Sequence, residues 1–106
     1  MLRITLHQDG QQYRLVLSGK LHGPWVSETE TVWRSVACPG KRIEVDMREV
    51  TAVDHSGCKL LAAMHDAGAE FVAQGVAMTA LIEEITGRQP FDGARQQRLR
   101  KKRSQR

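Results

Sequence analysis

The sequence predicts an α/β fold, a single domain with a mixed four-stranded sheet and about three helices packed mainly on one face. Its 106 residues suit one domain and are too few for two. Segments that alternate apolar and polar residues are interleaved with segments whose apolar residues recur at helical spacing. This order predicts a mostly parallel sheet with right-handed crossovers. Because the strands alternate rather than being apolar throughout, one face of the sheet should carry no helix.

The first two predicted strands form a hairpin. Apolar and polar residues alternate over residues 2–7, and a second apolar-rich strand follows over residues 13–18. Between them "DGQQ", residues 9–12, supplies an Asp-Gly pair, which tolerates the positive φ that tight hairpin turns need. The hairpin contributes one antiparallel pair, so the sheet is mixed.

The first helix and the third strand come next. Pro24 suits the first turn of a helix, where its missing N–H costs nothing, and apolar residues then recur at helical spacing to about Ala37. Pro39 and Gly40 should end this helix. Residues 42–47 alternate again and predict the third strand.

The second helix is predicted from about Ser56 to Ala67. Ser56 is the expected N-cap, and Gly68 is a natural left-handed C-cap. Residues 70–73 predict a short fourth strand, and residues 77–86 predict a third helix.

Charge divides the chain into two parts. Residues 88–106 hold eight basic residues and one acidic residue, a net charge of +7, whereas the other 87 residues hold eight basic and eleven acidic, a net charge of −3. We therefore expect a folded domain over residues 1–87 and a basic C-terminal tail over residues 88–106. Good helix formers fill residues 93–103, but no apolar stripe exists to dock them, which predicts a flexible tail or a frayed helix.

The tail should make weak, nonspecific contact with polyanions, because it is basic and has no interleaved aromatic residues for reading a sequence. The expected contact residues are Arg98, Arg100, Lys101, Lys102 and Arg103.

Several classes of function are disfavoured by composition. Cys38 and Cys58 match no zinc spacing, so we expect no metal and no cofactor. No apolar run is long enough to span a membrane, and the first ten residues alternate instead of forming an apolar signal stretch. These features predict a cytoplasmic protein with reduced cysteines and no membrane insertion.

Three stretches carry a resemblance to a known family. They are "LVLSGKL" at residues 15–21, "IEVDMREVTAVD" followed by "HSG" at residues 43–57, and "GAEFVAQG" at residues 68–75. Together with the order of elements, they resemble the STAS domain, the fold of the anti-anti-sigma factors, over about residues 2–86. The motif at its centre is an apolar residue, Asp, two residues and Gly at the start of a helix.

The resemblance implies a non-catalytic protein–protein interaction module, an anti-sigma factor antagonist-like regulator of bacterial transcription. Its partner would be an anti-sigma factor of the serine-kinase type. In that family the partner phosphorylates a serine or threonine directly after the Asp. Here that residue is His55, so the usual acceptor hydroxyl is missing, which predicts a domain that binds its partner without phosphorylation. The alternative is that the acceptor has moved one place to Ser56.

Two other functions stay open from the sequence. One is a STAS subunit that binds the ATPase of a membrane ABC-type transporter. The other is a small hydrolase using Cys58 and His55, although residues so close in sequence do not easily form a nucleophile–base pair.

The predicted partner-binding turn follows the third strand. Asp54 should brace the turn by accepting backbone N–H groups, and Gly57 should allow a close backbone approach. The residues of this turn are Asp54, His55, Ser56, Gly57, Cys58 and Lys59.

Overall fold

The computed structural model describes residues 1–10, 12–37, 40–87 and 91–92. Within them lie five strands and three helices. In chain order these are β1 (Leu2–Asp9), β2 (Gln12–Leu21), α1 (Pro24–Val36), β3 (Arg42–Val53), α2 (His55–Asp66), β4 (Glu70–Ala73), α3 (Val76–Thr86) and β5 (Phe91–Asp92).

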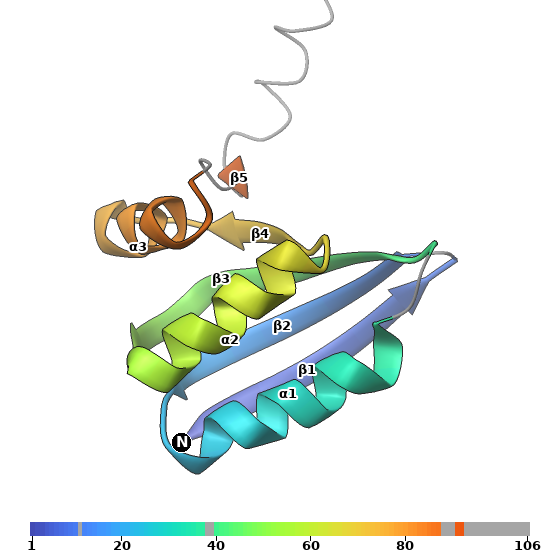
Figure 1. The fold of residues 1–106 in the computed structure, drawn as a ribbon, viewed down its shortest axis with the longest axis horizontal. Coiled ribbons are helices and arrows are strands. Elements are labelled where there is room, and N and C mark those ends of the chain that lie inside the picture. The colour runs from blue at the N-terminus through green and yellow to red at the C-terminus, as the bar shows by residue number, and fades with distance from the viewer. Residues whose placement is uncertain (11, 38–39, 88–90, 93–106) are drawn as a thin grey trace, which may run out of the picture.

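The strands form one mixed sheet in the order β1-β2-β3-β4-β5 (Figure 1). β1 and β2 are antiparallel, and the other neighbouring pairs are parallel. The predicted α/β class and the four predicted strands are confirmed. The additional strand β5 pairs with β4 and lies inside the segment that the sequence assigned to the tail. It has only two residues, too few for an alternating pattern to show.

The helices cover one face of the sheet, as expected. Each parallel strand is added beside the previous one in the same direction, so right-handed crossovers bring the helices to the same side. Figure 1 shows α1 and α2 lying across this face, and α3 contacts α2, β3 and β4.

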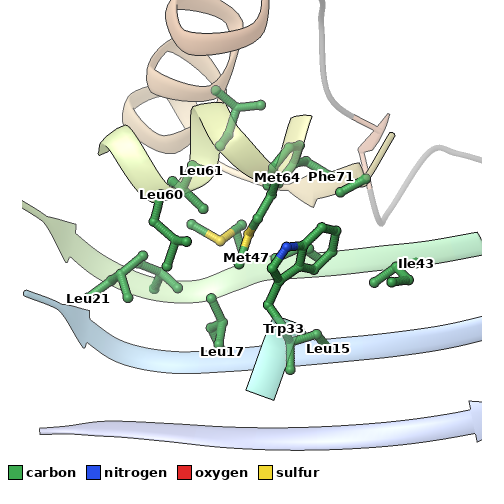
Figure 2. Close-up of a cluster of buried hydrophobic side chains, with 14 of the residues drawn as sticks. Leu15, Leu17, Leu21, Trp33, Ile43, Met47, Leu60, Leu61, Met64 and Phe71 are labelled. Atoms are coloured by element: carbon green, nitrogen blue, oxygen red, sulfur yellow. The ribbon is translucent and has the colours of Figure 1, made fainter. Parts of the chain in front are cut away.

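The hydrophobic core lies between this face and the helices (Figure 2). Leu15, Leu17 and Met47 rise from the central strands and are fully buried. Trp33 of α1 and Met64 of α2 close over them. The core is therefore shared between the central strands and the helices that cover them.

Ion pairs occupy the opposite face of the sheet. Arg14 Nε donates to Glu44 Oε1 over 2.9 Å, and Arg48 Nη2 donates to Asp46 Oδ2 over 2.7 Å. Both carboxylates are nearly buried, with Glu44 7% and Asp46 4% exposed. Burial alone would raise the pKa of Asp46, but the hydrogen bonds and charge of Arg48 more than offset it, and the net pKa is lowered.

Two strands are longer than the sequence predicted. β3 runs on to Val53, well past residue 47, and β2 runs on to Leu21. The register between them shifts after Val16 and again after Gly19. Each irregularity breaks the strict alternation by which a strand is recognised, so alternation alone stopped short. The stretches at residues 15–21 and 43–54 that carry the family resemblance already span both strand ends.

Some predictions fall outside the described residues. These concern Cys38, Pro39, the helical propensity of residues 93–103, and the tail cations Arg98, Arg100, Lys101, Lys102 and Arg103. Among the helices that the structure does describe, none combines the length and the apolar character needed to cross a membrane.

Candidate functional site

The predicted partner-binding turn joins β3 to α2, and Asp54 is the N-cap of that helix. Asp54 has an extended backbone, and its Oδ1 accepts from the backbone N–H of Gly57 over 2.8 Å. The prediction that Ser56 is the N-cap is therefore wrong. The helix begins at His55, so Ser56 is already inside the first turn, and its Oγ donates to Asp54 Oδ1 over 3.0 Å. Asp54 is correctly spaced to reach an unpaired N–H of that turn.

Asp54 also binds the loop between β2 and α1. Its Oδ2 accepts from the backbone N–H of Gly23 over 3.0 Å, and its own N–H donates to Leu21 O over 3.1 Å. The prediction that Asp54 braces the turn is confirmed. The N–H groups of Gly23 and Gly57, then the Ser56 hydroxyl, lower the pKa of Asp54, so this carboxylate stays ionised.

The contribution of this loop, which is made by His22 and Gly23, was not predicted from the sequence. A signal was available, because β2 and β3 were both predicted as strands of a parallel pair. The carboxyl ends of such neighbours meet at the same edge of the sheet. A residue following one strand could therefore be expected near a residue following the other.

Gly57 allows the close approach that the sequence predicted. It is buried, and a Cβ placed on it would lie 2.8 Å from Val53 Cγ1 and 2.9 Å from Leu21 O. The first turn of α2 is thus pressed directly against the ends of β2 and β3. No side chain larger than hydrogen fits without moving one of them.

The remaining residues of the turn differ in exposure. His55, Ser56 and Lys59 are exposed, whereas Cys58 is half-buried. They form a polar surface on a fixed helix start, and an open pocket in the described region lies elsewhere. That pocket, about 290 Å³, is lined by Trp33 and Ile43, and Ile43 stands at the opposite end of β3 from the turn.

Cys58 is poorly suited to be a nucleophile. Burial raises the pKa of its thiol, and the charges of Asp54 and Glu84 raise it further. A reactive cysteine needs the opposite shift, because the thiolate attacks. In the part of the chain that is described, no hydrogen bond joins Cys58 to His55, and no group of three or more His, Cys, Asp or Glu side chains could hold a metal ion. The geometry of the turn therefore does not favour the hydrolase hypothesis.

No family model and no curated protein matches this chain. Solved structures do. One is an anti-sigma factor antagonist from Mycobacterium paratuberculosis, with a TM-score of 0.69 and 19% identity over 82% of this chain and 79% of that chain. The chain has a STAS-like fold. An uncharacterized protein with a SpoIIAA-like fold from Shewanella loihica is also similar, with a TM-score of 0.51 and 14% identity over 86% of this chain and 82% of that chain.

The STAS-like fold confirms the resemblance that the three sequence stretches carried. In this fold the Asp54 turn stands at the carboxyl ends of the parallel strands β2 and β3, where the helix-covered layer meets solvent.

Proposed function

We propose that this STAS-like domain is a non-catalytic protein–protein interaction module, an anti-sigma factor antagonist-like regulator in the bacterial cytoplasm. The observation that carries the proposal is that Asp54 accepts hydrogen bonds from two separate segments. One carboxylate holds both the first turn of α2 and the β2–α1 loop through the N–H groups of Gly57 and Gly23. The exposed side chains beside it are therefore displayed on a rigid support, which lowers the ordering cost of binding.

The chemistry of the surface indicates what the partner presents. Asp54 Oδ1 and Oδ2 are already hydrogen-bonded to three donors within the domain. The exposed side chains beside it are the ammonium group of Lys59 and the polar side chain of His55. Such a surface complements a partner rich in carboxylates or carbonyl groups. The proposed partner is an anti-sigma factor of the serine-kinase type.

Phosphorylation at this turn would make it strongly negative. Ser56 Oγ is exposed and lies 3.0 Å from Asp54 Oδ1. A phosphoryl group on it would bring about −1.5 to −2 charges next to an ionised carboxylate. His55 occupies the position at which the family carries its acceptor hydroxyl. We therefore propose that the domain binds its partner without a phosphorylation cycle.

The test is a pair of surface variants assayed against the purified anti-sigma factor. Lys59→Glu should weaken binding about tenfold or more while leaving the melting temperature unchanged, because its side chain is exposed. Ser56→Asp, which replaces the hydroxyl bonded to Asp54 by a second carboxylate, should weaken binding by a similar factor without unfolding the domain. Arg42→Glu is the matched control. It makes the same change in charge at the opposite end of β3, where the Arg42 side chain is 71% exposed, and should leave affinity unchanged.

Unchanged affinity in both turn variants would refute the docking surface. A pull-down from the native host would test the partner class separately. Recovery of an ABC-type ATPase in place of an anti-sigma factor would refute the regulatory role but keep the fold.

A further inference from the structure

β1 presents an unprotected edge of the sheet. Among the described residues it is the outermost strand and pairs with β2 alone. Its eight residues, Leu2–Asp9, pair in an unbroken register and include no proline and no lysine. Native edge strands are usually shortened, bulged or blocked by such residues, because a free row of N–H and C=O groups attracts another strand. β5 at the other edge has only two residues.

The hydrogen-bonding pattern of β1 shows which residues direct their backbone N–H and C=O groups away from the sheet. Met1 O accepts from the N–H of Lys20 over 3.2 Å. In an antiparallel ladder, hydrogen-bonded pairs alternate with pairs that exchange no bond, so the odd-numbered residues of β1 bond to β2. The even-numbered residues Ile4, Leu6 and Gln8 therefore direct their N–H and C=O groups away from the sheet.

One two-fold register satisfies these groups and also matches the side chains. Centred on Leu6, it places Leu6 opposite Leu6 of a second copy and Ile4 opposite Gln8, so that each of these pairs exchanges two backbone hydrogen bonds. It also places Arg3 opposite Asp9, twice by symmetry. Centred on Thr5, the pairing would set Arg3 against His7 and leave Asp9 beyond the ladder.

The side chains at this edge are available. Leu6 is 40% exposed, unusual for a large apolar residue here. Arg3 and Asp9 are exposed, and within the described residues neither side chain makes a hydrogen bond or ion pair. In the register centred on Leu6, Arg3 of one copy and Asp9 of the other form a non-hydrogen-bonded pair, the position at which opposite side chains approach most closely.

We propose that this chain forms a homodimer in which β1 pairs antiparallel with β1 of a second copy about a two-fold axis at Leu6, with Arg3 of each copy against Asp9 of the other. The sheet then continues through both molecules. Because a single strand pair buries little surface, the dimer is weak, with a Kd in the micromolar range or above.

Sedimentation velocity of the full chain from about 5 µM to 1 mM tests the dimer in the range set by the interface size. Arg3→Asp and Asp9→Arg should each raise the dimer Kd about tenfold, because each places like charges opposite one another at two symmetric positions. The double variant R3D/D9R should restore the original Kd. Failure of the double variant to recover dimerisation would overturn the register, and a chain that stays monomeric to 1 mM would overturn the dimer.

Two single proline variants distinguish the dimer interface from the stability of the domain. Gln8→Pro removes an outward N–H and should abolish the dimer while keeping the circular dichroism spectrum and melting temperature. His7→Pro removes an N–H that bonds to β2 and should destabilise the domain instead. A Gln8→Pro variant that dimerises like the original chain would show that β1 is not the interface.

Discussion

Replacing Gly57 with alanine tests how tightly the start of α2 is held. The added Cβ would lie 2.8 Å from Val53 Cγ1 and 2.9 Å from the carbonyl oxygen of Leu21. The valine methyl can shift, but the carbonyl belongs to the backbone of β2 and already accepts from the N–H of Asp54. Relief of the overlap therefore requires the first turn of α2 to move away from the sheet.

The magnitude follows from two opposing effects. In a helix, alanine is favoured over glycine by up to about 1 kcal/mol. Inserting a methyl group into a packed site costs about 1–3 kcal/mol, and a backbone neighbour places this site toward the upper end. The expected net loss is about 1–2 kcal/mol in the free energy of unfolding. For a domain of this size it lowers the melting temperature by about 5–15 °C.

Thermal and urea denaturation followed by circular dichroism measure the loss, and titration with the proposed partner, an anti-sigma factor, measures binding. Affinity should fall as well, because the displaced turn carries His55 and Lys59. The double variant with Val53→Ala removes one of the two obstacles, so alanine at position 57 should cost less on that background. An unchanged or raised melting temperature for Gly57→Ala would refute the inferred close packing.

Three further predictions concern other parts of the chain. Truncation after Asp92 should leave the melting temperature unchanged and abolish the salt-sensitive retention on heparin expected of the basic tail. Truncation after Gly87 should also remove β5 and lower the melting temperature. The prediction is contradicted if both shortened chains have the melting temperature and the heparin retention of the full chain. Because the pKa of Asp46 is lowered in the fold, the stabilisation by its carboxylate is present above about pH 4, the pKa of the unfolded chain, and is lost as the pH falls through the pKa of the folded state. The free energy of unfolding should therefore fall on acidification, and it should fall less steeply in Asp46→Asn. Parallel plots of unfolding free energy against pH for the two proteins would count against the ion pair with Arg48. Intact mass spectrometry after incubation with the cognate kinase and ATP should show no stoichiometric phosphate, and a single phosphate mapped to Ser56 would show instead that the acceptor position has moved by one residue.

The sequence alone determined the elements and much of the site. Alternation and helical spacing are local signals, so the four predicted strands and the three helices followed from them. The Asp-x-x-Gly pattern was equally local. It predicted that Asp54 accepts backbone N–H groups and that Gly57 permits close approach, and both are confirmed.

Only the tertiary structure decided what depends on contacts between distant segments. Gly23 donates to Asp54 across 31 positions of sequence, and this contact exists because β2 and β3 are adjacent and parallel. The register shifts between β2 and β3 are not visible in a single strand, and β5 is defined only by pairing with β4. The outward phase of β1 likewise follows from its ladder with β2. Local periodicity specifies which residues face the core, whereas hydrogen-bond register specifies which segments meet.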